Sequence, residues 1–327
     1  MFIRFFKSSY LIQYLVLVII GVVLWIPAFL HPPQLLKVGH EVAPLFKLIE
    51  GLEPGVPWIP VLIAFLLVLA EGIIMNIIFI YHDLVPKNTL LSSFLFLLFM
   101  SSSAPNLTFY PAILSVLPLV FFLQLVFQIY DQSENLSKVL SVGLLASVCS
   151  MIYTPLILLL LFLWLVFMVY RTFNLREWII AFMGFILPYI YLIVFYFWND
   201  KLGNVLTNYR DYTRGIFDFT FSDDILQISI WVIFSLLMLL PSIVRVISGL
   251  SSNNIAFRRK MAVTIWLAVF GAFITLTGGN AGFNTVIYLP AAAIVAYQFQ
   301  VMKKSAWNEI VLLAYIILVG IHNYMAW

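Results

Sequence analysis

His40 and Glu41 are adjacent in the sequence and have the residue types of an acid–base pair. A histidine next to a carboxylate can supply a base that works near neutral pH. Adjacent residues point about 100° apart on a helix, so both side chains reach one substrate atom only where the backbone is irregular. The alternative interpretation is that both are solvated loop residues. If the chain is an enzyme, we expect Glu41 to act as the base.

A second polar group contains two arginines four residues apart, Arg210 and Arg214. On a helix this spacing places them on one face, where two guanidinium groups can clamp a phosphate or a pyrophosphate through charge-assisted hydrogen bonds. Tyr209 and Tyr212 belong to the same group and can stack on a sugar or an isoprenoid chain. The alternative is a surface ion-pair network that includes Asp211.

Glu71 is an acidic residue well inside an apolar stretch, LLVLAEGIIMNIIF. A charged carboxylate in hydrocarbon costs about 2.5–3.5 kcal/mol on insertion scales, so Glu71 is expected to face a cavity, to pair or to take up a proton. Asn76 follows five residues later and can lie near the same side. The alternative for this intramembrane polar pair is a hydrogen bond between helices.

The elements that must position these residues are membrane helices, because the composition excludes the other fold classes. Hydrophobic residues make up 64% of the chain and charged residues 9%, whereas soluble domains have roughly 25% charged residues. A β-barrel needs strands that alternate apolar and polar residues, but stretches such as 156–170 are apolar on every face. We therefore expect an all-α, polytopic transmembrane bundle that forms a single integral membrane domain over residues 1–327.

Apolar stretches separated by charged or turn-rich segments predict about eleven membrane spans. They cover roughly residues 10–30, 58–81, 89–104, 109–130, 138–152, 155–170, 178–198, 226–247, 261–277, 284–301 and 306–325. The third and the fifth are short, which suggests helices that enter a cavity or stop below the membrane surface. Outer loops 31–58 and 199–224 connect the longer spans, and the apolar spacing in the first predicts an interfacial helix.

Lysine and arginine are distributed unequally between the two faces that these spans define. With the N-terminus inside, the cytoplasmic set is Arg4, Lys7, Lys87, Lys138, Arg171, Arg176, Arg245, Arg258, Arg259, Lys260, Lys303 and Lys304. The opposite set is Lys37, Lys47, Lys201, Arg210 and Arg214. Because basic residues near span ends are retained in the cytoplasm, this difference predicts a bacterial inner-membrane protein with a cytoplasmic N-terminus.

Two short segments on the predicted cytoplasmic face have structural interpretations. The stretch RTFNLREW (171–178) predicts a hairpin between spans, with Asn174 as a turn or cap residue and Trp178 as an interfacial anchor. The run RRK (258–260) predicts contact with anionic lipid headgroups.

Several classes of site are not expected. The single cysteine, Cys149, lies in an apolar stretch and excludes a disulfide framework. His31, His82 and His322 lie near span ends without metal-ligand spacing, so no metal and no cofactor are expected. The formal net charge of +3 gives no case for a nucleic-acid partner.

The stretch FNLREWIIAFMGFILPYIYLIVFYFW (173–198), with FFKSSYLIQYLVLVIIG (5–21) and residues 84–106, resembles a family of uncharacterised polytopic inner-membrane proteins of Bacteroidota. That resemblance implies the location and the span count. The stretch SVGLLASVCSMIYTPLILLLLFLWLVFMVYR (141–171) is similar to the short-helix-then-long-helix pair of C-type (GT-C) membrane glycosyltransferases, and YLPAAAIVAY (288–297) is similar to their late membrane segment.

The second resemblance implies an enzyme that transfers a sugar from a polyprenyl-phosphate carrier on the non-cytoplasmic side. It assigns Glu41 as the acid of the first outer loop, and Arg210 or Arg214 to the carrier phosphate. The family usually has paired acids in that loop, whereas this chain has one His–Glu step followed by Glu50 and Glu53. Membrane lipids and this carrier are the expected partners.

The alternative function is a non-catalytic membrane subunit that scaffolds an envelope or secretion complex and binds a membrane-protein partner. A transporter would predict pseudo-symmetric halves, and the sequence has no such symmetry.

Overall fold

The computed structural model describes residues 2–33, 44–46, 56–102, 104–131, 136–171, 174–200, 203, 238–249, 253–277, 285–301 and 306–325. Within these ranges the chain is helical and contains no strand. The α-helices are α1 (Phe2–Phe5), α2 (Leu11–Leu30), α4 (Ile59–Tyr81), α5 (Leu91–Met100), α6 (Pro111–Asp131), α7 (Leu136–Ile152), α8 (Leu159–Tyr170), α9 (Leu175–Trp198), α12 (Ile255–Thr277), α13 (Thr285–Val301) and α14 (Ala306–Met325). Two 3-10 turns, η1 (Ala104–Leu107) and η2 (Thr154–Leu158), and a helix over Met238–Gly249 complete the described secondary structure.

Four helices, α2, α4, α6 and α9, are long and apolar enough to cross a membrane, and several shorter apolar helices accompany them. The predicted all-α class is confirmed, and the helix ranges follow the predicted spans within a few residues. Among the described helix ends, the largest difference is at α12, which begins at Ile255 rather than near residue 261. The predicted start of the span over 226–247 lies outside the described residues. The count of about eleven spans stays a prediction, because length and composition alone identify four.

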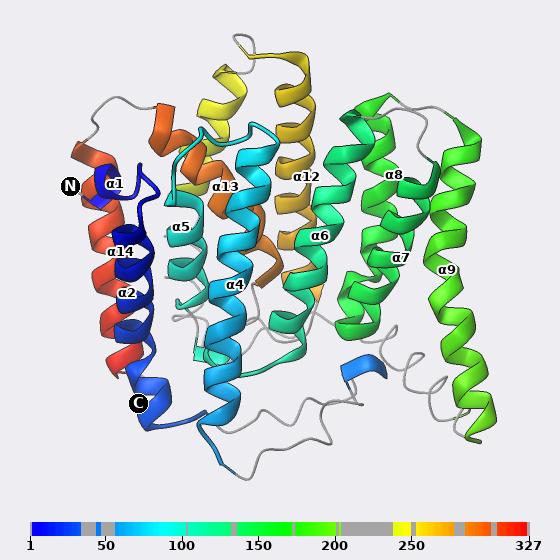
Figure 1. The fold of residues 1–327 in the computed structure, drawn as a ribbon, viewed down its shortest axis with the longest axis horizontal. Helices are drawn as coiled ribbons and strands as arrows, with labels where there is room; N and C mark the ends of the chain where they lie inside the picture. The colour runs from blue at the N-terminus through cyan, green and yellow to red at the C-terminus, as the bar shows by residue number, and fades with distance from the viewer. Residues whose placement is uncertain are drawn as a thin grey trace.

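Helix α5 is the centre of the bundle. All ten of its residues are buried, and both α4 and α13 pack against it. Figure 1 shows it between α2 and α4. The predicted span over residues 89–104, which is short in the sequence, corresponds to this short buried helix. It ends where the hydroxyl groups of Ser101 and Ser102 donate to the carbonyl oxygens of Leu97 and Phe99, which satisfies acceptors of the last turn.

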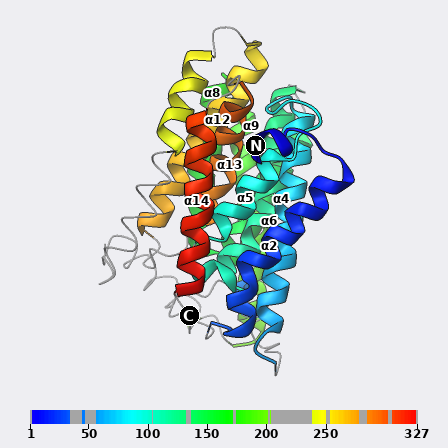
Figure 2. The ribbon, with the colours of Figure 1, turned by 90° about the vertical axis from the view of Figure 1, so that its left-hand side faces the viewer.

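The first and last long helices of the chain, α2 and α14, lie side by side (Figure 2). The amide of Asn323 donates to the carbonyl oxygens of Leu24 and Ser101, each at 3.0 Å. The indole N–H of the fully buried Trp25 donates to the hydroxyl group of Ser101 at 2.9 Å. These bonds join α2, α14 and the end of α5 inside the bundle, where no water competes for the donors.

At the other edge of the bundle, α9 packs on α7 (Figure 1). Gly143 and Gly184 face one another across this contact: a methyl group at Gly143 would overlap the carbonyl oxygen of Ala181, and one at Gly184 would overlap that of Leu140. Small residues at such a crossing let two backbones approach closely, which drives association where water supplies no hydrophobic force.

The sequence predicted a hairpin between α8 and α9 with Asn174 as a turn or cap residue. The cap is confirmed, whereas residues 172 and 173 lie outside the described residues. Arg171 ends α8 in the left-handed conformation, with φ of 60°, and is exposed. The side chain of Asn174 accepts a hydrogen bond from the backbone N–H of Arg176 at 3.2 Å and caps the start of α9.

The described lysines and arginines are carried by elements that meet at one end of the bundle, which we call the basic end. These elements are α1, the connection between α4 and α5, the helix over residues 238–249, and the adjoining ends of α7, α8, α9 and α12 (Figure 1). The predicted cytoplasmic set therefore shares one end as far as the structure describes it. The described chain begins at this end and finishes at the opposite one (Figure 1).

Candidate functional site

Most of the outer site expected from the sequence lies outside the described residues. This holds for His40 and Glu41, and for the second polar group, which comprises Tyr209, Arg210, Tyr212 and Arg214. Of loop one, the structure describes residues 31–33 at its start, 44–46 near its middle and 56–58 at its end. Of these, Leu45 lines a cavity.

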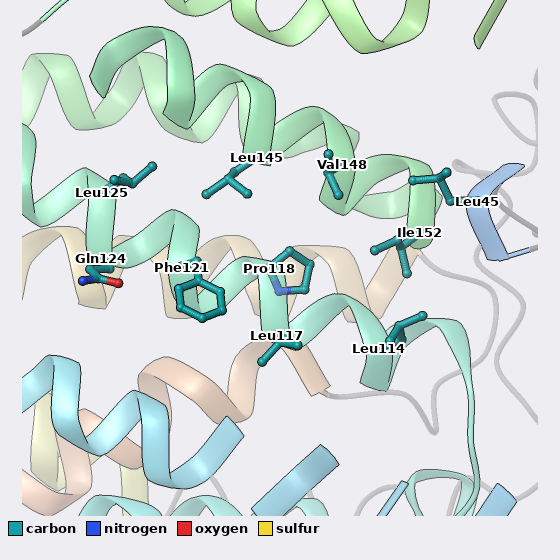
Figure 3. Close-up of a pocket in the computed structure, with 10 residues that line it drawn as sticks. All are labelled: Leu45, Leu114, Leu117, Pro118, Phe121, Gln124, Leu125, Leu145, Val148 and Ile152. Atoms are coloured by element: carbon teal, nitrogen blue, oxygen red, sulfur yellow. The ribbon is translucent and has the colours of Figure 1, made fainter. Parts of the chain in front are cut away.

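The cavity lies between α6 and α7 and has a volume of about 790 Å³. Figure 3 shows its walls, which are Leu114, Leu117, Pro118, Phe121, Gln124 and Leu125 from α6, Leu145, Val148 and Ile152 from α7, and Leu45 from loop one. Gln124 is the one polar residue among them. Such a lining excludes charged or strongly hydrated ligands, because their polar groups would lose water without gaining partners.

The cavity follows the length of α6. Leu114 and Leu125, eleven residues apart on one helix, place its two ends about 16 Å from one another. Leu45 lies beside Ile152 (Figure 3), near the end of α7 that is opposite the basic end. Phe121 is exposed and most other lining residues are half-buried. The cavity is thus an elongated apolar groove that reaches the protein surface.

Pro118 forms part of this wall and lies inside α6. It has no N–H to donate to the carbonyl oxygen of Leu114, and its ring crowds that carbonyl group, so α6 continues through this turn with one backbone hydrogen bond missing. Leu114, Leu117 and Pro118 surround this missing hydrogen bond and all contribute to the cavity.

The intramembrane polar residues Glu71 and Asn76 are both buried, at 0% and 2% exposure. The amide of Asn76 donates to the carbonyl oxygen of Thr89 at 2.8 Å, which ties α4 to the segment before α5. Neither carboxylate oxygen of Glu71 has a hydrogen-bond partner, and the polar group that faces it is the backbone of Leu117 in α6. The two residues therefore contact different neighbours. For Asn76, the structure supports the alternative given above, a hydrogen bond that joins α4 to a neighbouring segment.

A cluster of ionisable side chains closes the basic end. The ammonium group of Lys260 lies 2.7 and 2.9 Å from the two carboxylate oxygens of Asp131 and 3.2 Å from Nδ1 of His82. Lys260 is 5% exposed and His82 4%, whereas the Asp131 side chain is 40% exposed. Three helices meet here, since His82 follows α4, Asp131 ends α6 and Lys260 lies in the second turn of α12.

Nδ1 of His82 lies between the two charged partners, 3.2 Å from the Lys260 ammonium group and 3.3 Å from Oδ2 of Asp131. A neutral ring accepts from Lys260 in one tautomer and donates to Asp131 in the other. Burial, and then the positive charge of Lys260, lowers the pKa of His82 to about 4. Nε2 is buried and has no partner. His82 is therefore a neutral residue in contact with both Lys260 and Asp131.

Aromatic residues extend the cluster. The guanidinium group of Arg259 lies 6.0 Å from the ring centroid of Tyr130 and donates to the carbonyl oxygen of Val169 at 2.9 Å. The rings of Tyr130 and Tyr170 lie 5.1 Å apart. These contacts attach α8 to the ends of α6 and α12.

The prediction that residues 258–260 form a headgroup-facing surface is wrong for Lys260, because its ammonium group is consumed in the buried ion pair. The same contacts explain why α12 begins before residue 261. Arg259 and Lys260 bind protein groups while they lie within the helix, so their charges are satisfied without exposure to water. The signal was present in the sequence. His82, Asp131 and Lys260 each directly adjoin the cytoplasmic end of a predicted span.

In the part of the chain that the structure describes, no group of three His, Cys, Asp or Glu side chains could hold a metal ion. No protein-family model, curated protein or solved structure matches the chain.

Proposed function

We propose that the protein is a multi-pass protein of the bacterial inner membrane that acts in envelope assembly on a polyprenyl-phosphate-linked sugar, with the isoprenoid chain in the cavity between α6 and α7. The observation that carries this proposal is the meeting of an elongated apolar cavity with loop one at Leu45. Leu45 is four residues from Glu41, the expected base. A lipid chain held along α6 would thus bring its headgroup to the loop that carries the candidate chemistry.

The properties of the cavity favour a lipid over a soluble substrate. Its volume is within the range of about 300–1,000 Å³ that small-molecule sites occupy. Its lining offers one amide, Gln124, and otherwise carbon atoms. The ends of the cavity lie about 16 Å apart along a helix that is long enough to cross a membrane, so a chain could enter from the bilayer and stay parallel to its neighbours.

The proposed reaction is a sugar transfer on the non-cytoplasmic face. Glu41, with His40 beside it, takes the proton of an acceptor hydroxyl group, and the hydroxyl oxygen forms a bond to the anomeric carbon. The bond from that carbon to the carrier phosphate oxygen breaks, and polyprenyl phosphate leaves. Arg210 and Arg214 hold the negative charge that the phosphate keeps, and Tyr209 and Tyr212 stack on the sugar.

Two variants separate the lipid site from the chemistry. Leu145→Trp fills the cavity, and Glu41→Gln removes the base but keeps the size of the side chain. Leu161→Trp is the matched control, because Leu161 is 49% exposed on α8 and lines no part of the cavity. The measurements are native mass spectrometry of co-purified polyprenyl phosphate and analysis of the envelope glycans.

We expect Leu145→Trp to lose the bound lipid and the glycan product, Glu41→Gln to lose only the product, and Leu161→Trp to keep both. Equal lipid occupancy in the wild type and Leu145→Trp would overturn the lipid site. Unchanged glycans in Glu41→Gln would overturn the catalytic assignment.

One observation favours the alternative, a non-catalytic subunit of a membrane complex. Helix α9 stands at the edge of the bundle and buries only Glu177, Ala181, Gly184 and Phe185. The rest of its surface is available to a partner helix as well as to lipid. A stoichiometric membrane protein that cross-links to α9, together with full function in Glu41→Gln and Arg210→Gln, would establish this alternative.

A further inference from the structure

Glu71 lies near the middle of α4, twelve residues after Ile59 and ten before Tyr81. A helix of this length places it close to the centre of an apolar layer about 30 Å thick. The side chain is fully buried within the protein and does not face lipid. Glu71 is therefore a carboxyl group enclosed by other helices at membrane depth.

Among the residues that the structure describes, no charge compensates this carboxyl group. Around α4 pack α2, α5, α6 and η1. Neither α5 nor η1 carries a titratable residue, and α2 carries only Tyr14. The titratable residues of α6, Tyr130 and Asp131, stand more than three turns from Leu117, at the basic end. On α4 itself Tyr81 is the other titratable residue, ten positions away.

An ionised carboxylate without a cation is strongly disfavoured in such surroundings, and the backbone of Leu117 is the one described polar group beside it. Both oxygens of Glu71 lack a hydrogen-bond partner. A bound proton removes the charge and leaves a neutral acid that can donate one hydrogen bond. The carbonyl oxygen of Leu114, which loses its helical donor because residue 118 is proline, is an acceptor in the α6 turn that contains Leu117.

We propose that Glu71 is an intramembrane proton-binding site, and that its protonation controls the shape of the cavity between α6 and α7. Leu117 connects the two features, because its backbone faces Glu71 while its side chain lines the cavity. The neighbouring Pro118 removes one backbone hydrogen bond from α6 at the same turn. Loss of the proton places an uncompensated charge against this turn, so α6 shifts and the cavity changes. This inference requires a lipid chain in the cavity but no sugar transfer.

Labelling by N,N′-dicyclohexylcarbodiimide, an apolar reagent for protonated carboxyl groups, tests the proton site. The acid O–H adds across one C=N bond: the proton goes to nitrogen and the carboxyl oxygen to the central carbon. An internal O-to-N acyl shift then gives a stable N-acylurea, so no other reactant is needed. The full-length protein in detergent is labelled over a pH series, and the modified peptide is identified by mass spectrometry.

We expect the adduct on Glu71, with a rate that falls about tenfold per pH unit once the group ionises. Glu71→Gln gives no adduct at that position, and the exposed Asp200 is the internal control, which stays unmodified. The absence of an adduct on Glu71 at every pH would overturn the proton site, provided that Glu71→Gln and the wild type elute as the same monodisperse species.

Binding of a pyrene-labelled fatty alcohol, an apolar chain with no group that titrates in this pH range, tests the coupling to the cavity. We expect wild-type binding to change between acidic and alkaline pH, and Glu71→Gln, which is held neutral, to keep the acidic-pH affinity throughout. Equal pH dependence in both proteins would overturn the coupling. Because neither readout involves Glu41 or the glycan product, failure here is distinguishable from failure of the sugar-transfer proposal.

Discussion

The ammonium group of Lys260 lies 2.7 Å from Oδ1 of Asp131 and so joins the start of α12 to the end of α6, across 129 positions of sequence. The two partners are unequally buried, since the lysine side chain is 6% exposed and the aspartate side chain 40%. This asymmetry determines what the loss of either charge costs.

Asp131→Asn should destabilise the protein more than Lys260→Met. Removal of the carboxylate leaves a buried ammonium group without a counter-charge, at a cost of about 3 kcal/mol. Removal of the lysine leaves a carboxylate that water can reach, at a cost of about 1 kcal/mol. The free energy of unfolding in mixed detergent micelles measures both, and the double variant should recover part of the larger loss. Equal losses in the two single variants would contradict the burial argument.

His82 predicts a pH dependence of stability. Its pKa is lowered from 6.5 to about 4 in the folded protein, by burial and then by Lys260. Between these values the unfolded chain binds a proton that the folded protein rejects, so stability is complete above about pH 6.5 and falls as the pH drops toward 4. The slope is at most about 1.4 kcal/mol per pH unit.

Thermal unfolding of the wild type and of His82→Gln is measured over this pH range. The difference between their stabilities at each pH reports the titration of His82 alone, because all other groups titrate in both proteins. A slope that is the same in His82→Gln would show that another group is responsible.

Gly143→Ala should separate α7 from α9. The added methyl group would overlap the carbonyl oxygen of Ala181 and lie 3.0 Å from the backbone nitrogen of Phe185, and overpacking of this kind costs about 1–3 kcal/mol. Gly320→Ala is the matched control, because nothing lies within 4 Å of a methyl group there. It should be neutral or stabilising by up to about 1 kcal/mol. Equal free energies of unfolding for the two variants in detergent would contradict the prediction, because they would show that the close contact between α7 and α9 at Gly143 does not stabilise the protein.

The two ends of α9 test the predicted orientation. In a Cys149→Ser background, Arg176→Cys lies at the basic end and Trp198→Cys at the other, and both positions are exposed. A membrane-impermeant maleimide on spheroplasts should label Trp198→Cys directly and Arg176→Cys only after permeabilisation, because basic residues are retained in the cytoplasm. The reverse pattern would move loops 31–58 and 199–224 to the cytosol and remove the basis for transfer on the outer face.

The extent of most helices could be predicted from the sequence, because it depends on the hydrophobicity of a segment and on the residues that flank it. The Asn174 cap at the start of α9 followed from a short polar break in an apolar stretch. The start of α12 was misplaced because a basic run was assigned to water, whereas Arg259 and Lys260 bind protein groups within the helix. These partners come from distant helices. The sequence shows that His82, Asp131 and Lys260 each adjoin the same end of a predicted span, but not that their side chains meet.

The candidate site divides in the same way. Glu71 was recognisable from the sequence as a carboxyl group in an apolar stretch, but only the tertiary structure shows that both of its oxygens lack partners and that Leu117 faces it. The cavity had no sequence signal, because apolar residues that line a groove and apolar residues that fill a core have the same composition.

By itself, the sequence determined that the protein consists of apolar helices suited to a membrane, and it determined the extent of most of them. Both properties depend on hydrophobicity and on capping residues, which act over a few neighbouring positions. The tertiary structure decided which side chains meet: Asp131 with Lys260, Gly143 with Gly184, Glu71 with no counter-charge. The rotation of each helix and its choice of neighbour set these contacts, and an apolar helix with no distinct polar face leaves both undetermined until the bundle packs.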